Sequence, residues 1–208
     1  MATQGGTPTG RTGGTSPELR ERIVAATLVS LARYGVGKTT LEDVAKEAGC
    51  ARATVYRYFG GKQELLLAVV GHEALRILRA IDAAARTRTT LEDAVVAMAT
   101  TAAHELLEHD ALQFVLAHEP ELVLPAITFQ GCDRFVGTVG GALAPTFARF
   151  VGAANAERAA QWCTRVFLTY LGAEDAAVSM TDVDEVRALV RDFVAPALVA
   201  PAAHTIRG

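Results

Sequence analysis

The chain has 208 residues, half of them apolar, and a net charge of −3 at pH 7, a composition that predicts a globular protein rather than a disordered one. Its three cysteines are widely spaced and form no CxxC pair, which argues against a disulfide framework and against a zinc site. No apolar run reaches the ~18 residues that a membrane span needs, and the N-terminus lacks an apolar leader segment, so we expect a cytoplasmic protein.

The charge is divided unevenly along the chain. Residues 1–65 hold nine Lys and Arg against six Asp and Glu, a net of +3, whereas residues 66–208 hold eleven against seventeen, a net of −6. A small basic unit followed by a larger acidic one indicates two units with different functions. We predict a disordered tail at 1–16, a first domain at 17–65 and a second domain at 66–200.

Helical periodicity dominates the sequence. Alternation of period two is never sustained, and we therefore predict an all-α protein. The tail is rich in Gly and Thr, which is typical of disorder. Ser16 followed by Pro17 is a helix start signal, and we expect this first helix to end at Gly35.

A helix-turn-helix follows at residues 40–59. Thr40 and Asp43 have the spacing of a capping box, in which each side chain accepts a hydrogen bond from the other residue's backbone N–H. The turn contains Gly49, and the glycine pair 60–61 stops the second helix. In this motif the second helix enters the major groove of DNA.

That second helix lies within ARATVYRYFGGK, residues 51–62, which contains no carboxylate. At ~100° per residue, Val55 and Phe59 share one face, and Ala53 and Arg57 lie opposite them. A solvated helix face usually mixes charges of both signs, so this outer face favours an anionic partner. The residues whose chemistry suits base edges or phosphates are Arg52, Ala53, Thr54, Tyr56, Arg57, Tyr58 and Lys62.

The rest of the chain is predicted to be a series of helices. One runs from Lys62 to about Ala85, and the pentapeptide TTLED, which precedes the helix-turn-helix, recurs at 89–93 and starts another to about His109. Further helices are expected at 110–118, 121–150 and 155–171, the last one capped by Asn155. Thr181 with Asp184 is expected to cap a final helix to about Leu198. The prolines expected to break up the middle region are Pro120, Pro125 and Pro145.

The stretch from Arg22 to Leu66 resembles the DNA-binding domain of the TetR (tetracycline-repressor) family of bacterial transcriptional regulators. The segments that carry the resemblance are TTLEDVAKEAG and VYRYFGGKQELL. Where Leu31 stands the family often has Phe, which is a mild change in the core. The resemblance implies DNA contacts from Thr40, from the 52–58 helix and from Lys62. It also implies a homodimer and a variable helical domain that binds a small molecule, although the last ~140 residues match only in length and helicity.

The second domain offers candidates for a pocket and for a dimer interface. Few charges interrupt its helices, so a pocket there is expected to be mostly apolar, although aromatics at helical spacing are more often core residues. The pocket candidates are Met98, His104, Phe114, Phe129, Phe147, Trp162 and Phe167. Two late apolar stripes are expected to pair with their copies in a four-helix bundle. The interface candidates are Ala159, Cys163, Val166, Tyr170, Val186, Val190 and Phe193.

Two short motifs resemble functional sites but lack what those sites need. GVGKTT at 35–40 is similar to the end of a phosphate-binding loop, but Ala32 stands where that motif needs Gly, and a helix rather than a strand precedes it. HELLEH at 104–109 looks like a zinc helix. Its two histidines are five apart, however, and diverge by ~140°, so His104 is expected to pair with Glu108 on the surface.

Together these patterns predict a ligand-responsive transcriptional repressor. We expect it to bind a palindromic double-stranded DNA operator as a homodimer and to be released by an apolar small molecule. Two alternatives stay open: an architectural DNA-binding protein without an effector, and an enzyme with its active site in the helical domain. No nucleophile–base pairing or metal spacing supports the enzyme, and we expect no catalytic residue, metal or cofactor.

Overall fold

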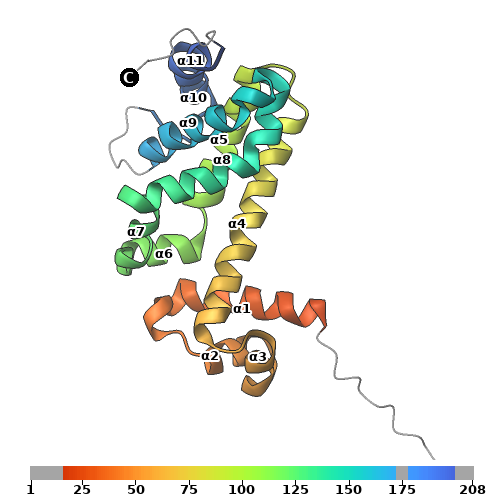
Figure 1. Ribbon diagram of the computed structural model, residues 1–208. Coiled ribbons are helices and arrows are strands. Elements are labelled where there is room, and N and C mark those ends of the chain that lie inside the picture. Colours follow the sequence, from red (N-terminus) through yellow and green to blue (C-terminus); the bar gives the residue numbers. More distant parts are fainter. Residues whose placement is uncertain (1–15, 172–177, 200–208) are drawn as a thin grey trace, which may run out of the picture.

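The computed structural model describes residues 16–171 and 178–199, and every regular element in these ranges is helical. The all-α prediction is therefore confirmed. Three helices form a small unit at one end, the later helices form a larger body at the other, and α4 runs between them (Figure 1). The elements are α1 (Pro17–Lys38), α2 (Leu41–Glu47), α3 (Arg52–Phe59), α4 (Lys62–Arg86), α5 (Leu91–Leu107), α6 (Asp110–His118), the 3-10 turn η1 (Pro120–Leu122), α7 (Leu124–Ile127), α8 (Phe129–Val151), α9 (Ala153–Leu171), α10 (Val183–Leu189), the π-helical segment η2 (Val190–Val194) and α11 (Ala195–Val199).

The small unit has its own core. Ile23 of α1, Val44 of α2 and Val55 of α3 are completely buried, and Leu65 from the first turn of α4 joins them. Helix α1 is interrupted at Gly35, whose φ of 76° and ψ of 178° are not helical, and a short turn follows. Regular helix thus stops at Gly35 as predicted, because only glycine adopts this left-handed φ readily.

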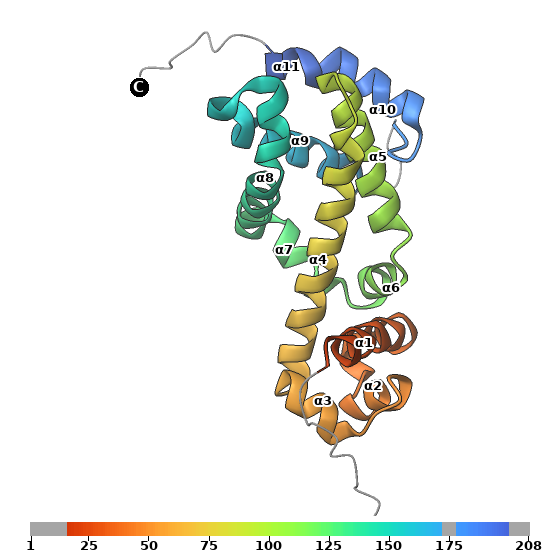
Figure 2. The ribbon, with the colours of Figure 1, turned by 90° about the vertical axis from the view of Figure 1, so that its right-hand side faces the viewer.

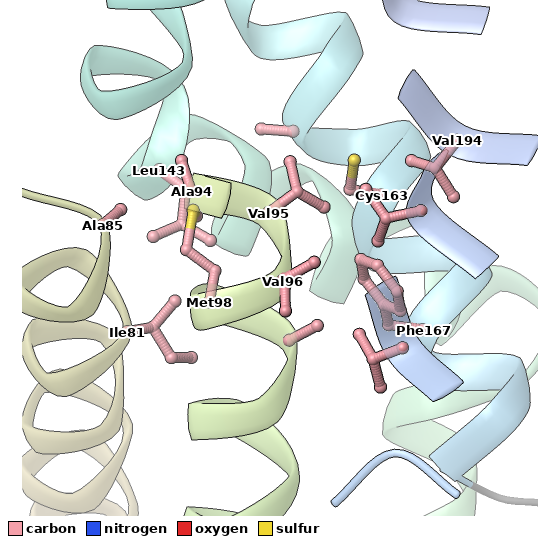
Figure 3. Close-up of a cluster of buried hydrophobic side chains, with 14 of the residues drawn as sticks. Ile81, Ala85, Ala94, Val95, Val96, Met98, Leu143, Cys163, Phe167 and Val194 are labelled. Carbon is pink, nitrogen blue, oxygen red and sulfur yellow. The ribbon is translucent and has the colours of Figure 1, made fainter. Parts of the chain in front are cut away.

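The larger body packs α5, α8, α9, α10 and η2 around a second core. Val95 of α5 points toward Cys163 of α9, whereas Met98 lies on the other side of α5, toward Leu143 of α8 and Ile81 of α4 (Figure 3). The cluster is almost entirely aliphatic and small, which suits close packing of helices. It lies far from the small unit and is reached from there along α4, as Figure 2 shows.

The middle of the chain differs from the prediction in two ways, because the helix expected at 121–150 is divided into η1, α7 and α8, and Pro145 does not break a helix. Pro120 and Pro125 start the short elements η1 and α7, as expected for a residue tolerated in a first helical turn. Pro145, however, lies inside the continuous helix α8. Its missing N–H leaves the carbonyl of Gly141 without an intrahelical donor, but both residues are exposed, so water can satisfy that carbonyl.

Two predicted helix caps are also wrong. Helix α9 begins at Ala153, directly after Gly152, and the amide oxygen of Asn155 accepts a hydrogen bond from Arg158 inside the helix. The last helical segment is capped by Asp182, whose carboxylate accepts from two backbone N–H groups, and not by Thr181. A carboxylate accepts both bonds and is favoured by the positive end of the helix, which a hydroxyl matches only in part.

No helix in the described ranges is both long and apolar enough to cross a membrane. The prediction of no membrane span from the sequence rests on the same scarcity of long apolar runs.

Candidate nucleic-acid interface

The helix-turn-helix is held by local hydrogen bonds that the sequence pattern predicts. The hydroxyl of Thr40 accepts from the Asp43 backbone N–H at 3.2 Å, and the Asp43 carboxylate accepts from the Thr40 backbone N–H at 3.1 Å. Hydrogen bonds from Thr40 lower the pKa of Asp43, because they stabilise its charged form. Between α2 and α3, Gly49 has a φ of 63°, and the Arg22 guanidinium donates to the carbonyl of Ala48 at 2.8 Å. The turn is thereby tied to α1.

Helix α3 has a buried side and an exposed side, divided as its sequence predicts. Val55 and Phe59 are buried in the core of the small unit, and Thr54 is half-buried at the border. Four candidate DNA contacts, Arg52, Ala53, Tyr56 and Arg57, are exposed together on the outer side. The result is a rigid helix that presents two guanidinium groups, a phenol and a small residue without a carboxylate among them, and this arrangement suits a major groove.

Tyr58 lies differently from its neighbours on α3. Its ring packs against the core, and its hydroxyl accepts a hydrogen bond from the Ser16 backbone N–H at 2.6 Å. The guanidinium of Arg57 sits 5.9 Å from the centre of this ring. Tyr58 therefore attaches the start of α1 to α3 in this structure, and its contact with a phosphate stays a prediction.

Lys62 lies at the first position of α4, beside the turn that follows Gly35. Its ammonium donates to the carbonyl of Gly37 at 3.2 Å. Thr40 follows shortly after this turn and is exposed. The structure thus places Lys62 and Thr40 at neighbouring helix N-termini, where backbone N–H groups and positive helix ends favour anions.

One residue at this end of the molecule was missed by sequence reasoning. Glu119, just after α6, places its two carboxylate oxygens on the backbone N–H groups of Val36 and Gly37, at 2.5 and 2.7 Å. The glycine-rich GVGKTT segment therefore does hold an anion, but the anion is a side chain of the same protein. The glycines of this segment indicated an anion-binding loop. The sequence near it could not indicate Glu119, which lies more than eighty residues away.

Only three of the seven pocket candidates come together. Met98, Phe147 and Phe167 are buried in the core of the larger body, Trp162 is 40% exposed on the outside of α9, and Phe114 stacks on His118 with ring centres 4.2 Å apart. The remaining two candidates are His104, which is exposed and pairs with Glu108 at 3.5 Å as predicted, and Phe129, whose side chain lies outside the described residues. Contact with a ligand stays a prediction for all seven.

The two histidines of HELLEH, His104 and His109, contact different residues. The Nε2 atom of His109 lies 3.3 Å from the carboxylate of Glu73 on α4, and its Nδ1 accepts from the backbone N–H of Leu112 to cap α6. His104 turns to Glu108 instead. Among residues 16–171 and 178–199, no three His, Cys, Asp or Glu side chains gather as metal ligands would.

Only some of the residues predicted for the dimer face lie at the surface of the protomer. Ala159, Cys163, Val186 and Val190 are buried in the protein's own core, so they cannot meet a second copy at the surface. Burial also raises the pKa of the Cys163 thiol to about 12. The stripes on α9 and α10 are apolar on more than one side, and sequence spacing did not show which side the core would take.

The outward side of these helices carries a shallow apolar groove of about 390 Å³. Val166, Tyr170 and Phe193 of the predicted interface line it, and Phe193 is 72% exposed. Trp162, which was assigned to a pocket, also lines this groove. The full lining is Trp162, Val166, Thr169, Tyr170, Leu189, Phe193 and Val194.

A family model and curated relatives match this chain, and they are bacterial regulatory proteins. Residues 23–69 match the family model for "Bacterial regulatory proteins, tetR family". The chain is 30% identical over 173 residues to the "Uncharacterized HTH-type transcriptional regulator MT1294" of Mycobacterium tuberculosis, covering 80% of this chain and 78% of that one. It is 38% identical over 77 residues to the regulator BetI of Agrobacterium fabrum, and this match spans only 37% of either chain.

Solved structures share the fold at low sequence identity. The TetR family repressor AlkX from Dietzia sp. matches with a TM-score of 0.62 at 20% identity, covering 90% of this chain and 97% of that chain. The regulator FadR from Bacillus subtilis, in complex with stearoyl-CoA, matches with a TM-score of 0.60 at 15% identity, covering 82% and 96%. At these identities the likeness concerns the fold.

Proposed function

The chain belongs to the tetR family of bacterial regulatory proteins and is a transcriptional regulator, and we propose that it is a repressor that binds a palindromic operator as a homodimer and leaves it when an apolar small molecule binds. The observation that carries the proposal is the outer face of α3. Arg52, Tyr56 and Arg57 are exposed there on a helix with a buried opposite side, and no carboxylate competes with DNA for them.

The homodimer is supported by the groove on α9 and η2. Large apolar side chains are exposed along it, chiefly Phe193 and Trp162, although most apolar residues of these helices are buried. A patch of this kind marks a contact surface. A two-fold dimer buries the same patch of both copies at once, and its symmetry requires an inverted repeat in the DNA.

The effector is proposed to be apolar and to enter between α5, the region from α6 to α8, and α9. The core there is lined by apolar residues, Met98 and Phe147 among them. Two proteins of similar fold support this class, because one was solved with stearoyl-CoA, whose acyl chain is apolar, and the other is implicated in biodegradation of n-alkanes. Such a molecule shifts DNA binding only by its unequal affinity for the free and DNA-bound states, typically ~1–3 kcal/mol.

The test is selection of duplexes from a random pool by the full-length protein, followed by binding measurements on the recovered sequence. We expect an inverted repeat, one dimer per site, and loss of preference at one position in each half when Arg52 or Arg57 is replaced by Ala. Recovery of duplexes without any shared sequence would contradict specific operator binding and favour an architectural DNA-binding protein. Calorimetry of fatty acyl-CoA and alkanes against free and DNA-bound protein tests the effector. Equal affinities would contradict release by that ligand.

A further inference from the structure

The small unit and the larger body meet where α6 passes over α1, as both views show (Figures 1 and 2). At this junction the Glu119 carboxylate reaches across, with one oxygen 2.5 Å from the Val36 backbone nitrogen and the other 2.7 Å from the Gly37 backbone nitrogen. Both carboxylate oxygens of Glu119 therefore accept hydrogen bonds from the small unit, which contains the helix-turn-helix. Hydrogen bonds to a charged carboxylate are about twice as strong as neutral ones.

The receiving site is built by the break in α1. With Gly35 at a φ of 76°, the N–H groups of the next two residues start a new turn and have no helical carbonyl before them. Successive N–H groups beside a left-handed residue form a concavity that binds anions. A Cβ atom at Gly35 would meet the Glu119 carboxylate and the Phe114 ring, so glycine is also needed for this close approach.

The same turn holds the predicted phosphate contacts. The Gly37 carbonyl accepts from the Lys62 ammonium at 3.2 Å, and the hydroxyl of buried Thr39 donates to the Gly35 carbonyl at 2.6 Å. Thr40, the first residue beyond, caps α2. Glu119 therefore holds one side of this turn by hydrogen bonds. The other side of the turn contacts Lys62 and leads into the N-terminus of α2.

We propose that Glu119 is a positioning residue for DNA binding, which acts from outside the DNA-binding unit by fixing the Gly35–Lys38 turn and, through it, Lys62 and Thr40. The inference rests on the proposed DNA-binding function. For the removal of this carboxylate, it predicts a change in DNA affinity of the opposite sign to the one expected from charge alone. Removing a negative charge from a DNA-binding protein normally strengthens binding to the phosphate backbone, whereas removing this carboxylate is expected to weaken it.

The test compares Glu119→Gln with Glu121→Gln in the full-length protein. Both variants lose one negative charge two residues apart, but Glu121 is exposed and makes no hydrogen bond or ion pair within the described residues. On the selected duplex, we expect Glu119→Gln to raise the dissociation constant by about tenfold and to lower the salt slope, by at most the amount that Lys62→Ala does, because Lys62 loses its fixed position. Glu121→Gln is expected to bind as the parent does or slightly more tightly. Equal tightening in both variants would overturn the proposal.

A second variant and a second readout separate positioning from folding. Glu119→Asp keeps the charge but is one methylene shorter, and it is expected to weaken DNA binding as well. Amide hydrogen exchange at Val36 and Gly37 should accelerate about tenfold or more in both Glu119 variants, whereas exchange in the core of the small unit stays slow. Fast exchange without any loss of DNA affinity would leave Glu119 a purely structural residue and refute its positioning role.

The failure of this inference is distinct from a failure of the proposed function. If the parent protein binds no duplex at any salt concentration, the DNA-binding proposal and the role of Glu119 both fall. If the parent and both Gln variants bind the selected duplex alike, DNA binding stands and the role of Glu119 falls.

Discussion

Replacement of Phe193 by Ala tests the dimer surface with a magnitude that follows from the structure. Full burial of a Phe side chain is worth about 1.5–3 kcal/mol, and 72% of Phe193 is exposed in one protomer. Burial of this exposed part of Phe193 by a partner protomer is therefore worth about 1–2 kcal/mol of dimerisation free energy. A two-fold interface contains the residue twice, so Phe193→Ala should cost the dimer about 2–4 kcal/mol, or about 30- to 900-fold in dissociation constant.

Sedimentation velocity over a range of protein concentrations measures this constant directly. The matched control is Leu67→Ala on α4, where the side chain is 73% exposed but lies outside the groove on α9 and η2. The control should dimerise as the parent does, and helical content measured by circular dichroism should be the same in both variants, because neither residue supports the protomer's core. An unchanged dimer constant for Phe193→Ala, or an equal loss in the control, would refute the assignment of this face.

Three further outcomes are expected. Lys62→Ala should weaken binding to all duplexes alike and lower the slope of the salt dependence by about one. Arg57→Ala should instead cost about 1–3 kcal/mol of binding free energy at one base pair. A changed sequence preference for Lys62→Ala would contradict its contact with a phosphate. Because its folded pKa is lowered by Thr40, Asp43 stabilises the fold above its unfolded pKa of about 3.9, and this stability is lost as the pH falls through the folded pKa. Asp43→Asn should therefore show a smaller loss of stability in urea titrations between pH 5 and the acid limit, and an unchanged acid dependence would count against the capping box. Since burial raises the pKa of Cys163 to about 12, this thiol should react with a disulfide reagent at pH 8 only after unfolding, and its labelling in the native protein would show that the core opens.

The DNA-binding unit was predictable because its signals are local. A capping box at Thr40, a turn at Gly49 and a stop at Gly60 all act within a few residues, and Val55 with Phe59 marks the buried side of α3 at helical spacing. Each signal depends on backbone geometry that the neighbouring residues determine. For this reason the helix bounds and the exposed side of α3 both follow from the sequence.

The errors in the larger body come from choices that distant residues decide. Pro145 continues a helix because its face of α8 is exposed to water, and Asp182 rather than Thr181 takes the last cap. On α9, Cys163 and Trp162 are adjacent and both apolar, yet one is buried and the other exposed. Helical spacing shows which residues share a side, but only the packing of the other helices decides which side becomes the core.

The contact of Glu119 has a mechanical consequence for the whole molecule. The chain joins the two units once through α4, and this carboxylate joins them again at the turn after Gly35. A rigid body held at one point can turn about three axes, whereas a body held at two separated points keeps only the axis through both. Displacement of the larger body is then constrained at both attachments, and because α6 also packs on α1 at the second one, loss of the Glu119 carboxylate would weaken that attachment without removing it.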